Sequence, residues 1–259
     1  MRRSFLKSLL AFAAPCLVAA SLPSCATNDS MMFIEGVALQ KAGACTVKAE
    51  LNGTFIAKGR MDRLLATDYV AALIVGNQIT QRGSRERVRT ETSRVALKGA
   101  EVKLENAQGA SLVPAFSSIG TGFVDASDGT DAAPAVMFAA LIPASVAPSL
   151  PRGTVVAKVR VFGTTLGGED VESSELSFPI DVCDGCLVTF SAAERDPTQG
   201  GTDNYVCKAA SDTAPAVTEA DAPCTLGIDF PTPCTTCSGV LAECQSPTNN
   251  CAYNLAACK

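Results

Sequence analysis

The residues best suited to chemistry are cysteines, and the most distinctive group is Cys183-Asp184-Gly185-Cys186. Two cysteines at this spacing can bind a metal ion as thiolates, exchange electrons with another thiol pair, or form a structural disulfide. The Asp-Gly step lies between two strand-like stretches, 177–182 and 187–190, which predicts a tight hairpin turn. The common type of redox site needs a helix that begins at the first cysteine, and residues 187–190 are not helical in character. We therefore expect a structural disulfide here, with thiol-redox activity as the alternative.

A second pair with the same spacing, Cys234-Thr-Thr-Cys237, makes a zinc site an alternative to disulfides. A hairpin tip bearing two cysteines is one half of a zinc ribbon, and the second pair could complete a four-cysteine site. The stretch between the pairs is long for that motif, and the exported location argued below favours oxidation. A zinc site made by Cys183, Cys186, Cys234 and Cys237 remains the alternative to disulfides, and we expect no bound cofactor.

The cysteines are unevenly distributed. Residues 26–182 contain Cys45 alone, whereas residues 183–259 contain Cys183, Cys186, Cys207, Cys224, Cys234, Cys237, Cys244, Cys251 and Cys258. This density, with few large apolar side chains, is typical of a small module held together by disulfides. These nine cysteines cannot all pair with one another. We therefore predict that Cys45 bonds to one of them and ties the C-terminal module to the preceding domain.

The chain contains no histidine. A Ser-His-Asp or Cys-His arrangement is therefore excluded, and the commonest metal ligand is missing. The sequence also lacks a Gly-x-Ser-x-Gly elbow, a P-loop and a dinucleotide-binding fingerprint. We expect no catalytic activity.

The N-terminus has the pattern of an export signal. Met1-Arg-Arg-Ser-Phe-Leu-Lys7 resembles the twin-arginine signal, and an apolar stretch over 8–22 leads to Leu22-Pro-Ser-Cys25, which resembles a lipoprotein cleavage and acylation site. The alternative is an ordinary cleavage site after Val18-Ala-Ala20, which would leave Cys25 as a thiol. We predict a signal peptide over 1–24 and a lipidated Cys25 with a short tether over 25–32. Ala26, rather than Asp, follows the cysteine, and its resemblance to the sorting pattern of enterobacterial lipoproteins implies attachment to the outer membrane.

Removal of the signal peptide takes away Arg2, Arg3 and Lys7 and shifts the formal net charge from −5 to −8. An acidic protein is not suited to general nucleic-acid binding, which requires a basic face. Arg85, Arg87 and Arg89 nevertheless share one face if their segment is extended. They could bind lipid phosphates, an acidic envelope glycan or a protein partner, or they could simply protect an edge strand or loop with charge.

The region between the signal peptide and the cysteine-rich module is predicted to form β-strands. Stretches rich in β-forming residues, separated by Gly, Pro, Asn or Asp, occupy 37–39, 45–51, 67–79, 95–104, 136–142, 155–162 and 176–182. In the stretch 155–162, Val155, Ala157, Val159 and Val161 alternate with residues that include Lys158 and Arg160, the pattern of a half-buried strand. We predict a mainly β protein: an antiparallel, immunoglobulin-like β-sandwich over 33–182, followed by a small disulfide-rich C-terminal module over 183–259.

Three segments, Tyr69 to Gln78, Arg82 to Leu97 and Phe178 to Leu187, resemble parts of a family of predicted bacterial lipoproteins with no assigned activity. The resemblance covers most of the mature chain and implies an anchored, cysteine-rich protein of the outer membrane. It supplies no catalytic residue. We therefore expect a structural or interaction role in the cell envelope, with thiol-redox or zinc-binding activity of the cysteine pairs as the alternative.

Overall fold

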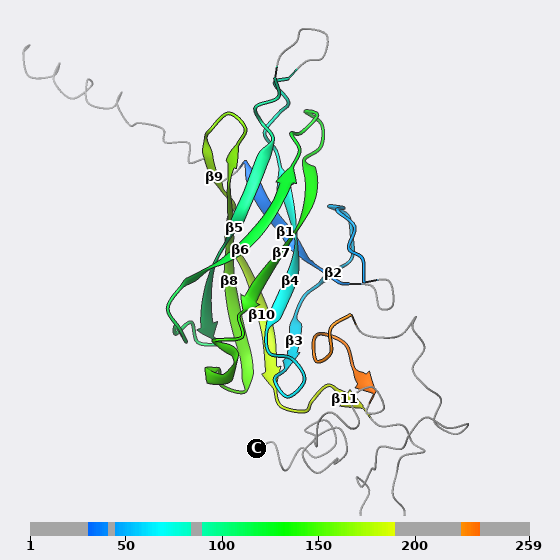
Figure 1. Cartoon of the computed structure of the whole chain (residues 1–259), viewed down its shortest axis with the longest axis vertical. Coiled ribbons are helices and arrows are strands. Elements are labelled where there is room, and N and C mark those ends of the chain that lie inside the picture. The colour runs from blue at the N-terminus through cyan, green and yellow to red at the C-terminus, as the bar shows by residue number, and fades with distance from the viewer. Residues whose placement is uncertain (1–30, 41–44, 84–89, 190–223, 234–259) are drawn as a thin grey trace, which may run out of the picture.

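The computed structural model describes residues 31–40, 45–83, 90–189 and 224–233. Within these ranges the protein is mainly β, as predicted (Figure 1). The fold has two larger sheets, a short 3-10 helix η2 (Ala147–Ser149) and a small two-stranded sheet.

The first large sheet has four strands in the order β2-β1-β4-β7. They are β1 (Met32–Ala38), β2 (Phe55–Ile56), β4 (Tyr69–Asn77) and β7 (Ala133–Ile142). All neighbours in this sheet are antiparallel. β4 is central, and its apolar run Leu73-Ile-Val75 is fully buried, which accounts for the long β-forming stretch in the sequence.

The second large sheet has the order β3-β10-β8-β5-β6, with β9 pairing with β8. Its strands are β3 (Gly59–Asp62), β5 (Val95–Asn106), β6 (Phe116–Val124), β8 (Gly153–Thr165), β9 (Asp170–Glu172) and β10 (Leu176–Cys183). Four pairs are antiparallel, but β3 and β10 run parallel, with Gly59 opposite Ile180 and Asp62 opposite Cys183. This pair departs from the predicted antiparallel arrangement, because β3 and β10 are distant in sequence and no hairpin connects them.

One hydrophobic core includes residues of both large sheets, among them Leu73 and Met137 from the first and Val102, Val159 and Ile180 from the second. The alternation predicted for residues 155–162 is confirmed. Val155, Ala157, Val159 and Val161 are fully buried, whereas the residues between them are partly exposed. Burial of this apolar set, at about 25 cal/mol per Å² of surface removed from water, is the main force that holds β8 in place.

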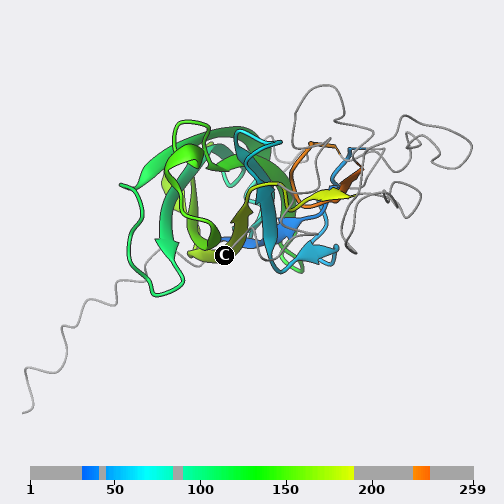
Figure 2. The same ribbon diagram turned by 90° about the horizontal axis from the view of Figure 1, so that it is seen from below.

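The segment Cys224–Pro233, here called the docked segment, packs against the rest of the described chain. Ile228 belongs to the shared core and forms an isolated bridge with Met61 of β3. In Figure 1 this segment, coloured orange, lies next to β3, and in Figure 2 it lies beside the yellow strand β11 (Val188–Thr189). The described part of the predicted C-terminal module is therefore integrated with the β domain, and the remainder of that module lies outside the described residues.

The hairpin predicted around Asp184-Gly185 is wrong. The chain does turn there, with Gly185 at a φ of 75°, but β11 (Val188–Thr189) does not pair back onto β10. Instead it pairs in parallel with β12 (Thr232–Pro233) of the docked segment. The backbone after the turn is held by a side chain from β3, described below, and by the docked segment, where the amide of Thr232 donates to the carbonyl of Leu187 at 2.7 Å.

Candidate functional site

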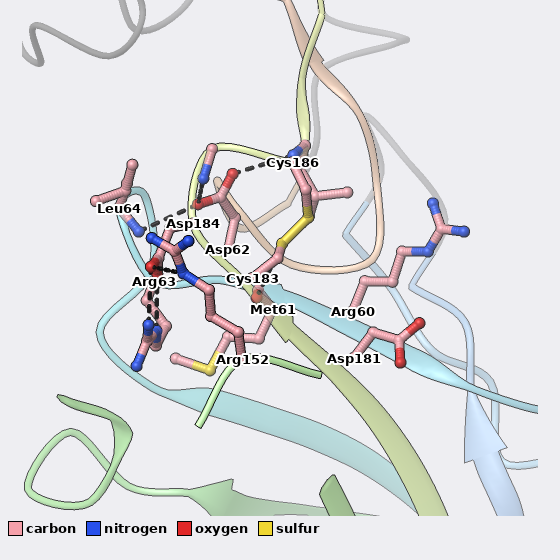
Figure 3. Close-up of a disulfide and its surroundings, with 12 residues drawn as sticks. Arg60, Met61, Asp62, Arg63, Leu64, Arg152, Asp181, Cys183, Asp184 and Cys186 are labelled. Atoms are coloured by element: carbon pink, nitrogen blue, oxygen red, sulfur yellow. Dashed lines mark hydrogen bonds and ion pairs between the residues drawn. A yellow bond between two sulfur atoms is a disulfide. The ribbon is translucent and has the colours of Figure 1, made fainter. Parts of the chain in front are cut away.

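The candidate site is the turn that closes β10, where Cys183 and Cys186 form a disulfide (Figure 3). Both cysteines are half-buried, and their Cα atoms lie 5.9 Å apart. The parallel pairing of β3 with β10 positions this turn, since it brings the ends of both strands to the same edge of the sheet. Asp62, the last residue of β3, consequently lies opposite Cys183.

The Asp62 carboxylate organises the turn from within. It is fully buried and accepts three backbone hydrogen bonds: from Leu64 at 3.1 Å, from Gly185 at 2.7 Å and from Leu187 at 3.0 Å. Burial raises the pKa of this carboxyl, and the three amide donors act in the opposite direction. A buried carboxylate is tolerated only when its oxygens are satisfied, so Asp62 and the turn depend on each other.

Asp184, inside the disulfide ring, faces two arginines. Arg63 donates two hydrogen bonds to its carboxylate, each 2.8 Å long, and Arg152 donates one at 2.6 Å. Arg63 also donates to the carbonyl of Leu150 at 2.7 Å. Partial burial acts to raise the pKa of Asp184, but the hydrogen bonds and charges of the two arginines outweigh it and hold this pKa below its usual range. A bidentate Arg–carboxylate pair of this kind fixes orientation as well as charge.

A second buried carboxylate anchors the docked segment. Asp229, which has a φ of 58°, accepts a hydrogen bond from the amide of Arg60 at 2.9 Å, and the hydroxyl of the fully buried Tyr69 lies 3.0 Å from both of its oxygens. Burial raises the pKa of Asp229 and that of Tyr69. This pair joins β4 of one large sheet to a segment that also contacts β3 of the other.

The second disulfide joins Cys45 to Cys224, across a sequence separation of 179. The predicted bond between Cys45 and a cysteine of the C-terminal region is therefore present, and its partner is Cys224. By the chain-entropy relation, closing a loop of this length contributes about 5 kcal/mol, whereas the ring closed by Cys183 and Cys186 contributes about 2 kcal/mol. The long-range bond thus has the properties of a staple, and the short one adds little constraint to a turn that Asp62 and Asp184 already hold.

The structure describes four of the predicted site residues, and the others lie outside the described ranges. It pairs Cys183 with Cys186 and Cys45 with Cys224. While the first pair is oxidised, its sulfurs are not available as zinc thiolates, although one Asp62 oxygen and both sulfurs lie within 4.8 Å of one another. The remaining predicted residues lie outside the described residues: Cys25, Arg85, Arg87, Arg89, Cys207, Cys234, Cys237, Cys244, Cys251 and Cys258.

Sequence reasoning missed Asp62, Arg63 and Arg152. No local motif marks Asp62, because the amides it binds at Gly185 and Leu187 are 123 and 125 residues away. The two arginines are likewise far from Asp184, with separations of 121 and 32 residues. The one available signal was the acidic residue between the two cysteines, which needs a cationic partner once it is half-buried.

The surface of the β domain offers a small pocket and several exposed apolar side chains. The pocket, of about 220 Å³, lies against the four-stranded sheet and is lined by Leu39, Val47, Phe55 and Ile74 among others. It is smaller than the roughly 300 to 1,000 Å³ of typical ligand sites. On β6, Ile119 is 87% exposed and Phe123 54%, and on the adjacent β7 Phe138 is 48% exposed.

Among the described residues, no helix has the length and apolar character needed to cross a membrane. In comparisons with known proteins, the chain matches no family model and no curated protein.

Proposed function

We propose that this chain is a lipid-anchored protein of the outer membrane that acts through its surface, in a structural or interaction role, and has no catalytic activity. The disulfide between Cys45 and Cys224 is the main observation that supports a location in the cell envelope. Disulfides of this kind persist in oxidising compartments. An exported location agrees with the twin-arginine and acylation patterns at the N-terminus and with the resemblance to predicted bacterial lipoproteins.

The β domain is proposed to be an immunoglobulin-like β-sandwich. Two sheets that contribute to one core support a two-layer arrangement. The parallel pair β3–β10 and the integrated docked segment are additions to that simple layout.

The interaction role is supported by the surface. The small pocket is poorly suited to a drug-sized ligand, whereas Ile119, Phe123 and Phe138 expose apolar area on neighbouring strands. Arg94 stacks over the Phe123 ring at 4.7 Å, which covers part of that side chain. Exposed apolar side chains on neighbouring strands favour contact with a protein partner.

The predicted patch of Arg85, Arg87 and Arg89 offers a second mode of recognition, toward an acidic envelope glycan or an acidic protein surface. Replacing all three with glutamate should weaken retention on isolated envelope material, whereas the matched replacement with lysine should preserve it. Equal retention of both variants would remove the patch from the proposal.

The anchor is tested by metabolic labelling with a palmitate analogue. Wild type should incorporate label and fractionate with the outer membrane, and Cys25→Ala should do neither. Cys16→Ala is the matched control, because this cysteine lies within the predicted signal peptide and its loss should leave labelling intact. Labelling of Cys25→Ala equal to wild type would overturn the proposed site of attachment.

A further inference from the structure

The two cysteines of the Cys183–Cys186 disulfide are held in place by other contacts as well as by the bond between their sulfurs. Each end is fixed by contacts that do not involve sulfur. Cys183 is the last residue of β10 and pairs with Asp62 of β3, while the amides of Gly185 and Leu187, on either side of Cys186, both donate to Asp62. If the sulfur bond opens, these contacts keep the two cysteines close together.

The turn is also held from outside the ring. Asp184 is bound by Arg63 and Arg152, with the closest contacts at 2.8 Å and 2.6 Å. Figure 3 shows these arginines on one side of the ring and the Asp62 carboxylate next to the sulfur bridge. Several contacts besides the disulfide therefore determine the position of the pair.

Arg63 and Arg152 bring two positive charges to the ring. They bind the carboxylate of Asp184, and they also offset the negative charge of the Asp62 carboxylate, one oxygen of which lies within 4.8 Å of both sulfurs. Positive charge near a cysteine stabilises the thiolate that leaves when a disulfide is attacked. Both cysteines are partly exposed, which attack by an incoming thiol requires.

We infer that Cys183–Cys186 is a redox-active disulfide that exchanges reversibly with a dithiol while the fold stays intact. A thiolate of the dithiol bonds to one sulfur, and the Cys183–Cys186 bond breaks with its electron pair on the other sulfur. The second thiol of the dithiol then attacks this mixed disulfide and closes its own ring. Two electrons and two protons pass from the dithiol to Cys183 and Cys186, which end as thiols, and the dithiol ends as a disulfide.

This inference goes beyond the proposed surface role and does not depend on the lipid anchor. It also differs from the common helical redox site, because the residues after Cys186 form β11. In place of a helix N-terminus, the turn uses a buried carboxylate to hold the backbone and an arginine pair to supply positive charge.

The test uses the mature full-length protein and dithiothreitol as the probe. Samples equilibrated with increasing dithiothreitol are alkylated without denaturant, mapped by mass spectrometry, and followed in parallel by near-ultraviolet circular dichroism. Cys183 and Cys186 should become labelled together while the folded signal is unchanged, and removal of dithiothreitol with addition of oxidised glutathione should restore the bond. Labelling that begins only as the folded signal is lost, or reduction that glutathione does not reverse, would overturn the inference.

The variant Arg152→Gln tests whether the arginines assist the exchange. The exchange rate of a disulfide that is merely accessible would not depend on this charge. The Arg152 side chain is 54% exposed, and Arg63 should still bind Asp184 in this variant. The exchange rate at Cys183–Cys186 should fall several-fold, and the rate at Cys45–Cys224 should stay as in wild type. Equal rates for wild type and Arg152→Gln at Cys183–Cys186 would contradict electrostatic assistance by the arginines, and so would an equal change of rate at both disulfides.

Discussion

The Asp62 carboxylate accepts a 2.7 Å hydrogen bond from the amide of Gly185, a residue 123 positions later in the chain. This contact links the end of β3 to the turn that carries the Cys183–Cys186 disulfide. The parallel register that places Asp62 opposite Cys183 makes it possible. The Asp62 side chain of β3 thus holds the backbone on both sides of Cys186, at Gly185 and at Leu187.

Replacement of Asp62 with alanine should destabilise the protein by about 3 kcal/mol, because the buried amides of Gly185 and Leu187 and the partly buried amide of Leu64 lose their acceptor. Urea unfolding of Asp62→Ala and wild type measures this free energy. Asp62→Asn is the matched control, since its amide oxygen can still accept and its loss should be smaller. A change in Asp62→Ala below about 0.5 kcal/mol, the range of ordinary surface substitutions, would show that the carboxylate does not hold the turn.

The two disulfides should differ in their effect on stability. The chain-entropy relation gives a loss of about 5 kcal/mol for the double variant Cys45→Ser/Cys224→Ser and about 2 kcal/mol for Cys183→Ser/Cys186→Ser. Thermal and urea unfolding of both double variants against wild type check the order. The reverse order would mean that the short ring constrains the fold more than its loop length implies.

The free energy of unfolding should depend on pH through the carboxyl group of Asp184. The arginines hold the pKa of this carboxyl below its ordinary 3.8 in the folded state. A group with a depressed folded pKa contributes stability that is present above the unfolded value and is lost as the pH falls through the folded value. Asp184→Asn should therefore be about 2 kcal/mol less stable than wild type at about pH 6, and this difference should shrink as the pH falls below 3.8. Unfolding free energies of both proteins across this range measure the effect, and a difference independent of pH would contradict it.

Removal of the Tyr69 hydroxyl should loosen the docked segment selectively. Tyr69→Phe loses a hydrogen bond to a carboxylate, which corresponds to about 2 kcal/mol, while Asp229 keeps the amide of Arg60. Hydrogen exchange measured by mass spectrometry should accelerate in the peptide covering 224–233 and remain unchanged in β8. Uniform acceleration across both peptides would indicate global destabilisation instead.

The features predicted correctly from the sequence depend on local residue patterns or on the number of cysteines. Alternation marks the buried face of 155–162, and the odd number of cysteines in the C-terminal region predicts a bond to Cys45. The choice of Cys224 as its partner depends on how the docked segment packs, which Ile228 decides by entering the core. Local patterns carry no such information.

The Asp62 site was missed for the same reason. The Asp184-Gly185 step is a good hairpin signal, and it does turn the chain, but the strand that follows is drawn to Thr232–Pro233 rather than to β10. Long-range contacts of Leu187 with Asp62 and Thr232 outweigh the local preference for a hairpin. A short strand such as β3 gives little periodic signal, so its parallel pairing was not foreseen either.

We propose a lipid anchor at Cys25, and the mass of the mature protein isolated from its native envelope tests this proposal most directly. We predict a chain that begins at Cys25 and carries the added mass of a diacylglycerol and an acyl chain. A chain that begins at Ser21, without added lipid mass, would show that the ordinary cleavage site after Ala20 is used and would contradict the anchored model.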